Sequence, residues 1–161
     1  MVRNRSTLVK GEDGDDHAVP NNVLFSAWLV SRSATALVDR AVDAAGLTAD
    51  EFAIYSLLRS GPIRPTELAT WMAAPPTTIS STVKRLEGRG HVRREPNPDD
   101  RRSYRLALTA AGQRAHLQAG MHFLPVLAEV ERVLGKGEPS VLRALGSLRA
   151  AMDEVATGLD A

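Results

Sequence analysis

Apolar residues recur at helical spacing along most of this chain and alternate over a short segment in its second half. Between Asn22 and Ala45, apolar residues rich in alanine recur every three to four positions and would form one stripe of a helix. Gly46 suits the left-handed position just past the end of that helix. Trp28 lies on this stripe and is expected in the core, with a ligand contact as the alternative. Thr48 to Glu51 has the pattern of a capping box and opens a second helix, whose inward side chains are Phe52, Tyr55 and Leu58.

Two shorter helices and a two-stranded hairpin are predicted next. The first helix runs from Pro65 to Met72, and the second begins near Pro76, because proline suits a first helical position but would break an interior one. The second helix has one apolar face, which consists of Ile79, Val83 and Leu86. The strands span residues 92–95 and 104–108, and the segment between them is rich in proline and Asx residues, which favour turns.

The last third of the chain predicts two long helices. Thr109 can cap the first, which reaches about Leu134 and contains Pro125, where we expect a kink or a short break. The second opens at residues 138–140, and its apolar residues follow the four-and-three spacing of a helix-pairing seam: Val141, Leu145, Leu148, Met152, Val155 and Leu159. Such a seam favours pairing with a second copy of the chain over packing among the helices of one chain.

The outer face of the helix that begins near Pro76 carries short polar side chains and cations. These are Thr77, Thr78, Ser80, Ser81, Lys84 and Arg85, and no acid precedes Glu87. Hydroxyls and cations suit the major groove of DNA, where base edges and phosphates present mainly acceptors. The alternative for this face alone is an ordinary solvated surface.

Positive charge is concentrated in the same part of the chain. Residues 84–105 hold eight Lys and Arg against four Asp and Glu, so the segment carries +8 − 4 = +4, whereas the whole chain carries only +1. Arg101 and Arg102 lie at the tip of the predicted hairpin. The charge therefore strengthens the case for a nucleic-acid partner.

These residues together resemble the winged helix-turn-helix of MarR-type transcriptional regulators. The family run T-[VI]-S-x-x-V-x-x-L-E-x-x-G is matched from Thr78 to Gly90, and the wing run D-x-R-x-x-x-L-x-L-T-x-x-G is matched from Asp100 to Gly112. The resemblance implies that Arg102 enters the minor groove and that Asp100 holds it. The implied fold is mainly α with a small β-hairpin wing, a winged helix-turn-helix plus a helical dimerisation layer.

The resemblance also implies a division of the chain. Residues 47–109 would bind DNA, whereas residues 21–46 and 110–161 would form the dimerisation region, with Leu24 and Trp28 joining the seam of the last helix. In the family a small aromatic or lipophilic effector binds between the two regions. Trp28, Arg32 and Tyr55 are the candidates for lining such a site.

Composition narrows the remaining possibilities. The chain has no cysteine, which excludes disulfides, thiolate metal sites and cysteine redox sensing. The four histidines form no compact ligand set, so neither a metal nor a cofactor is expected, and no combination of nucleophile and base indicates an enzyme.

Residues 1–20 mix charge and glycine and are expected to form a disordered tail. No apolar run predicts a membrane span or a signal sequence, so a cytoplasmic protein is expected.

The sequence therefore predicts a homodimeric, sequence-specific DNA-binding transcriptional regulator, a repressor relieved by a small-molecule ligand, on a pseudo-palindromic operator. The predicted DNA-binding residues are Thr77, Thr78, Ser80, Ser81, Lys84, Arg85, Arg94, Asp100, Arg101 and Arg102, with the two threonines and two serines on base edges or backbone. Two alternatives stay open. One is a sequence-independent nucleoid-organising or RNA-binding protein, and the other is a helical protein-interaction module.

Overall fold

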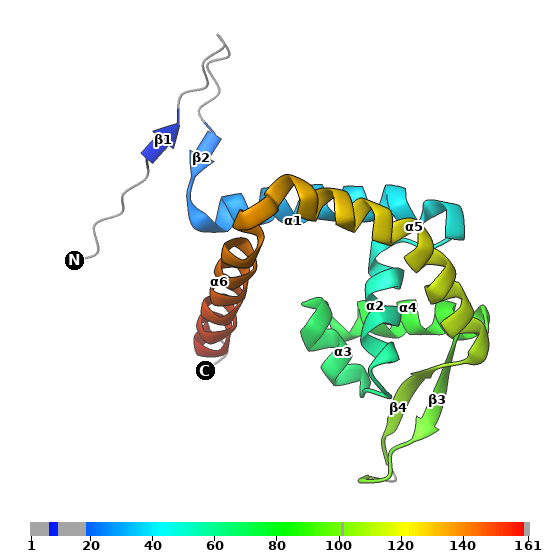
Figure 1. The fold of residues 1–161 in the computed structure, drawn as a ribbon. Helices are drawn as coiled ribbons and strands as arrows, with labels where there is room; N and C mark the ends of the chain where they lie inside the picture. The colour runs from blue at the N-terminus through cyan, green and yellow to red at the C-terminus, as the bar shows by residue number, and fades with distance from the viewer. Residues whose placement is uncertain (1–6, 10–18, 101, 160–161) are drawn as a thin grey trace. The chain divides into compact units, whose positions relative to one another are not determined.

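The computed structural model describes residues 7–9, 19–100 and 102–159 (Figure 1). Its elements in chain order are β1 (Thr7–Val9), β2 (Val19–Asn21), α1 (Val23–Val42), the 3-10 helix η1 (Asp43–Ala45), α2 (Ala49–Arg59), α3 (Pro65–Met72), α4 (Pro76–Gly88), β3 (Val92–Pro96), β4 (Tyr104–Leu108), α5 (Ala110–Leu134), the 3-10 helix η2 (Gly135–Gly137) and α6 (Glu138–Leu159). The chain forms two compact units, Met1–His122 and Phe123–Ala161. The predicted mainly helical fold with a hairpin is confirmed.

The core of the first unit lies between α2, α3, α4 and the β3–β4 hairpin. Leu68 of α3, Leu86 of α4 and Leu106 of β4 are all fully buried. β3 and β4 pair antiparallel, from Val92 opposite Leu108 to Pro96 opposite Tyr104. Ile63, just before α3, exchanges two backbone hydrogen bonds with Leu106, at 3.1 and 2.8 Å. A third short stretch of chain therefore pairs with the middle of β4 and ties the hairpin to α3.

The starts of α2 and α3 show two ways to cap a helix. The predicted capping box of α2 is confirmed, since the Thr48 hydroxyl accepts from the Glu51 amide and the Glu51 carboxylate accepts from the Thr48 amide. At α3 the N-cap residue is Arg64, whose guanidinium has no acceptor atom. Only the second half of the box remains there, in which Glu67 accepts from the Arg64 amide at 2.7 Å.

A tight joint links the end of α4 to the start of α5. The Thr109 hydroxyl donates to the Gly90 carbonyl at 2.6 Å and accepts from the Gly112 amide at 3.1 Å, so it caps α5 as predicted. A Cβ atom at Gly112 would lie 2.1 Å from the His91 carbonyl oxygen, closer than any side chain can come. Glycine at this position lets the first turn of α5 sit directly on the chain that leaves α4.

The N-terminal part of the first unit differs from expectation in two respects. Trp28 is not in the core of the chain, because 56% of it is exposed, and its ring stacks on Phe25 with centroids 5.8 Å apart. Within the predicted tail, β1 and β2 pair antiparallel, which was not predicted. Residues 1–6 and 10–18 of that tail lie outside the described part of the chain. Gly46 has φ 69°, the left-handed conformation predicted after the first helix.

The second unit consists of the rest of α5, η2 and α6. α5 continues through Pro125, so the short break does not occur. Among residues 123–159, all of which the structure describes, none is buried. The apolar side chains predicted to form the α6 seam are at least partly exposed, up to 82% at Leu159. None of the helices in the described ranges has the length and apolar character needed to cross a membrane.

Candidate nucleic-acid interface

The outer face of α4 is solvent-exposed over its full length. Ile79, Val83 and Leu86 are buried, as the spacing predicted. The six polar and cationic residues predicted on the opposite side are all exposed: Thr77, Thr78, Ser80, Ser81, Lys84 and Arg85. The Ser81 hydroxyl donates to the Thr78 carbonyl at 2.9 Å, which leaves its oxygen available as an acceptor. α4 therefore presents a hydroxyl-rich surface to solvent.

Arg85 is held at one edge of this surface by an acid from another helix. Its Nη1 atom lies 2.6 Å from Oε1 of Glu51, and Arg89 Nη1 lies 3.1 Å from each oxygen of the same carboxylate. The Glu51 side chain is only 1% exposed. Glu51 was predicted as a capping residue and not as an ion-pair partner, because the sequence distance of 38 residues between it and Arg89 carries no local signal.

Arg94 also forms an ion pair with an acid of the same chain, Glu87. Its Nε and Nη2 atoms donate to the two oxygens of Glu87 at 2.8 and 3.0 Å, and its guanidinium lies 4.6 Å from the centroid of the Tyr104 ring. The hydrogen bonds to Glu87 raise the pKa of Arg94 above its usual range. This bidentate pair links the last turn of α4 to the base of the hairpin.

Asp100 shapes the tip of the hairpin by accepting hydrogen bonds from two backbone amides. Asp100 Oδ1 accepts from the backbone amide of Arg102 at 2.9 Å, and its carbonyl accepts from the Ser103 amide at 3.0 Å. The side chain of Asp100 therefore holds the backbone of Arg102. Arg102 itself is exposed, and Arg101 lies outside the described residues.

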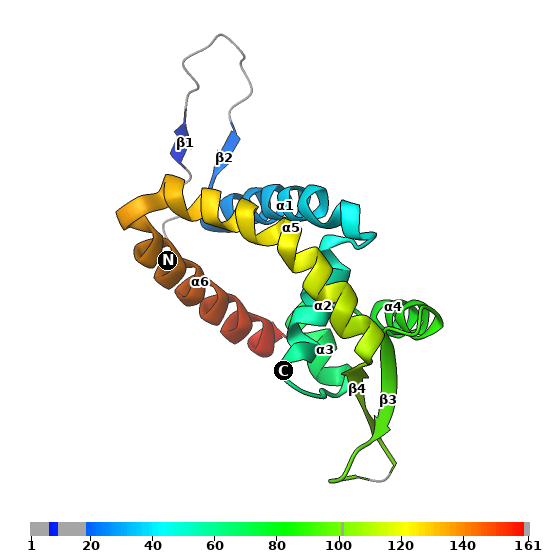
Figure 2. The ribbon, with the colours of Figure 1, turned by 45° about the vertical axis from the view of Figure 1, so that its right-hand side comes forward.

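Two further residues of the tip have structural partners that were not predicted. Asn97 is 4% exposed, and its amide donates to the Ser103 hydroxyl at 2.9 Å. Asp99 forms an ion pair with Arg105 of β4. Together they fix the loop from which Arg102 projects. Figure 2 shows β3 and β4 as a ribbon extending from the base formed by α2 and α4.

The sequence of this part of the chain matches that of a known family. The family model described as the MarR family matches residues 47–104, which cover α2, α3, α4 and most of the hairpin. The resemblance to the MarR family is confirmed. No curated protein matches the sequence.

Solved structures of MarR-like regulators have the same fold. The M. tuberculosis transcriptional regulator MOSR in complex with DNA is 26% identical, with a TM-score of 0.73, covering 84% of this chain and 98% of its own. BldR from Sulfolobus solfataricus is 20% identical, with a TM-score of 0.71 and coverages of 80% and 92%. A mutant MarR from E. coli complexed with operator DNA is 23% identical, with a TM-score of 0.66 and coverages of 76% and 89%. The MarR family is one of transcription factors and not of enzymes.

The three residues predicted to line a MarR-type effector site differ in their burial. Tyr55 is fully buried, and its hydroxyl lies 2.7 Å from Nδ1 of His91. Burial, and secondarily the charge of Glu51, raise the pKa of Tyr55 to about 12, so the hydroxyl keeps its proton. Trp28 and Arg32 are exposed on α1.

The described part of the first unit contains two cavities that are lined by other residues. The larger, of about 730 Å³, lies between the chain at residues 62–67 and the hairpin at residues 97–105. The smaller, of about 260 Å³, is lined by Asp39, Arg40 and Asp43. Within the described ranges, no group of three His, Cys, Asp or Glu residues is arranged to hold a metal ion.

Proposed function

We propose that this protein is a homodimeric, sequence-specific DNA-binding transcriptional regulator. α4 would lie in the major groove, and Arg102 would reach the adjacent minor groove. The observation that carries this proposal is the exposed hydroxyl-and-lysine face of α4, which belongs to the same compact unit as a hairpin that projects Arg102. The MarR match and the DNA-bound relatives support a DNA-binding regulator in general.

The ion pairs show which of the described cationic side chains are free to contact DNA and which already pair with an acid. Among the described residues of the predicted cationic surface, Lys84 and Arg102 have no acid partner within the salt-bridge distance, so both are ready to meet phosphate or base edges. Arg85 and Arg94 would first have to leave Glu51 and Glu87. Thr77, Thr78, Ser80 and Ser81 remain the proposed contacts to base edges or backbone, and Arg101 a contact at the tip. Asp100 would act by shaping the loop.

Dimerisation, regulation and location are the finer parts of the proposal. Two-fold symmetry would place the two α4 helices on half-sites about 34–36 Å apart, which requires a pseudo-palindromic operator. The exposed apolar residues of α1 and α6, Leu24 and the α6 seam among them, support a second copy as partner. Repression in the cytoplasm, relieved by a small aromatic or lipophilic effector near Trp28, Arg32 and Tyr55, rests on the family resemblance alone.

A competition experiment tests the function itself. Inverted repeats in the intergenic sequence beside the coding region provide candidate operators, and footprinting selects the bound site. At physiological salt the protein should prefer that site over random duplex by roughly 10³-fold or more. Equal affinity for both would favour a sequence-independent nucleoid-organising or RNA-binding protein. Absence of duplex binding even at low salt would favour a protein-interaction module.

The wing contact has its own test. Replacing Arg102 with alanine removes the exposed guanidinium of the tip, and operator binding should weaken by about 1–3 kcal/mol while the dimer stays intact. The matched control is Arg143→Ala on α6, which removes the same charge from the other compact unit and should leave affinity unchanged. A gel-shift titration in which both variants bind like the wild type would refute the role of Arg102.

A further inference from the structure

The carboxylate of Glu51 does more than cap its own helix. Glu51 Oε2 accepts from the Thr48 amide at 3.1 Å, which completes the capping box at the start of α2. A capping box needs one side-chain oxygen, and a glutamine oxygen serves as well as a carboxylate oxygen. The negative charge of this nearly fully buried side chain is therefore not explained by capping.

That charge faces Arg85 of α4 and Arg89, the C-cap residue of the same helix. Arg85 and Arg89 are one helical turn apart, so they lie on the same side of α4, and both bring Nη1 to the Glu51 carboxylate, at 2.6 and 3.1 Å from Oε1. A buried carboxylate is tolerated when cations and hydrogen-bond donors surround it. The guanidinium side chains are 49% and 40% exposed, so water reaches them from the outside.

We propose that Glu51 is a positioning residue for sequence recognition, and that Arg85 orients α4 instead of neutralising a DNA phosphate. This inference rests on the proposed function. By holding the last turn of α4 and its C-cap residue against the start of α2, Glu51 would fix the rotation of α4 about its own axis. The hydroxyls of Thr77 and Ser81 then face outward at one defined angle.

The geometry of a helix explains why this rotation matters. Side chains on a helix of about 10–12 Å diameter move about 1 Å for every 10° of rotation. Hydrogen bonds to base edges tolerate only a few tenths of an ångström around about 2.9 Å. The apolar contacts of Ile79, Val83 and Leu86 stabilise the packing of α4 but are non-directional. Directed ion pairs to a fixed carboxylate restrict rotation more strongly.

The first test replaces Glu51 with glutamine. Glu51→Gln keeps an oxygen for the Thr48 amide and nearly the same volume, but it removes the charge that holds Arg85 and Arg89. Affinity for the footprinted operator should fall about tenfold or more, whereas affinity for random duplex should hold or rise, because one negative charge is lost. The matched control is the exposed neighbour Asp50→Asn, which removes the same charge and should leave the ratio of the two affinities unchanged.

The second test separates an orienting arginine from a phosphate contact. Each phosphate contact contributes about 0.9 to the slope of log affinity against log salt. Lys84→Ala should reduce the slope by about that amount and preserve the operator preference. Arg85→Ala should leave the slope unchanged and reduce the preference. A slope change for Arg85→Ala equal to that for Lys84→Ala would overturn the inference.

The outcomes also separate this inference from the proposed function. A wild type with no operator preference would remove the function and the inference together. A wild type that prefers its operator, with a Glu51→Gln variant that keeps the same preference, would overturn the inference alone. Thermal unfolding followed by circular dichroism establishes that each variant is folded at the assay temperature. If Glu51→Gln is not folded there, the salt slopes of Arg85→Ala and Lys84→Ala decide.

Discussion

The segment from α2 to β4 and the segment from Phe123 to the end of α6 are built differently. The first has its own core, in which Leu68, Leu86 and Leu106 are fully buried. In the second, residues 123–159 include none that is buried, although apolar residues recur along α6 at helix-pairing spacing. An apolar face that stays uncovered within one chain indicates a surface meant for another. The segment from α2 to β4, which we call the recognition segment after its proposed role, thus has a core within one chain. We propose that the C-terminal helices obtain theirs from a second copy of the chain.

Charged residues differ between the two segments in the same way. In the recognition segment, Glu51 and Glu87 pair with arginines from other elements or turns, which fixes the elements relative to one another. In the C-terminal segment, Glu129 pairs with Arg132 three residues away on the same helix. Such an exposed local pair adds only a few tenths of a kcal/mol to the helix. The ion pair between Glu129 and Arg132 therefore does not compensate for the lack of buried residues in the C-terminal segment.

The largest expected effect is on the partner surface of α6. Leu148→Asp would place a carboxylate in the seam of each chain, and an unpaired buried charge costs on the order of 3–5 kcal/mol. Sedimentation equilibrium should show monomers for this variant. Ser147→Asp, at an exposed neighbouring position of α6, should leave the dimer intact. A dimer that survives Leu148→Asp would mean that the interface lies elsewhere.

A core substitution should separate the two segments by stability. Leu68→Ala removes a fully buried side chain and should lower the free energy of unfolding by about 2–5 kcal/mol. Leu159→Ala removes a leucine that is 82% exposed and should change the stability of the chain little. Urea unfolding at one fixed protein concentration measures both. Equal losses would contradict a separate core in the recognition segment.

The joint between α4 and α5 gives a smaller effect. Gly112→Ala forces a Cβ atom against the His91 carbonyl, and the resulting shift should cost about 1–3 kcal/mol. Gly120→Ala on the same helix meets no atom within 4 Å and should stabilise α5 by up to about 1 kcal/mol. If the two substitutions change the free energy of urea unfolding in opposite directions, the close approach of His91, and not the flexibility of glycine, explains the requirement for Gly112.

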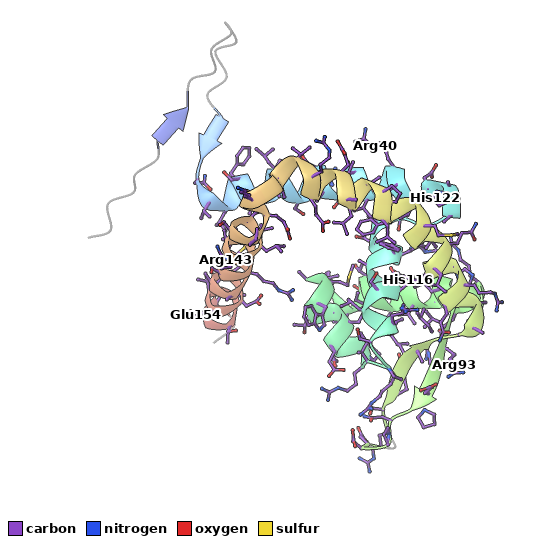
Figure 3. All side chains as sticks on the ribbon, viewed as in Figure 1. Arg40, Arg93, His116, His122, Arg143 and Glu154 are labelled. Carbon is purple, nitrogen blue, oxygen red and sulfur yellow. The ribbon has the colours of Figure 1, made fainter. Side chains whose placement is uncertain are left out.

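The smallest effect concerns pH. His116 of α5 lies against α2, where it stacks on Phe52 and hydrogen-bonds Ser56 (Figure 3). Burial, and secondarily the charge of Arg59, lower the pKa of His116 in the folded chain. The unfolded chain, with its histidine near the ordinary value of about 6.5, therefore takes up the proton first. Stability from this group is complete above about pH 6.5 and falls as the pH drops toward the folded pKa.

The test compares urea unfolding at two values of pH. The wild type should lose part of its stability between pH 7.5 and pH 5.5, and His116→Gln should lose less over the same interval. If His116→Gln loses as much stability as the wild type between these two pH values, another group is responsible for the pH dependence.

Local chemistry made much of the fold predictable. Thr48, Pro76 and Thr109 mark helix starts through caps and prolines, which act within four residues, and the structure has α2, α4 and α5 beginning there. The exposed face of α4 followed from its spacing in the same way. These features depend on neighbours along the chain, so the order of the residues contains them.

Features that depend on distant contacts were missed or misjudged. The pairing of Glu51 with Arg85, and of Tyr55 with His91, joins residues more than 30 positions apart. Asp100 accepts a hydrogen bond from the backbone amide of Arg102, an atom that the sequence pattern did not single out. Trp28 lies on the apolar stripe of α1, yet 56% of it is exposed in the described structure. Periodicity identifies a face but does not say what lies against it.

The Thr109 hydroxyl bonds the carbonyl of Gly90, and the first turn of α5 rests on His91. Gly90 is where the chain leaves α4, and His91 is where it enters β3. A displacement of the first turn of α5 would therefore bear on the end of α4 and the start of β3 at the same point of the chain. The helix and the hairpin that we propose to contact DNA are thus coupled through one joint.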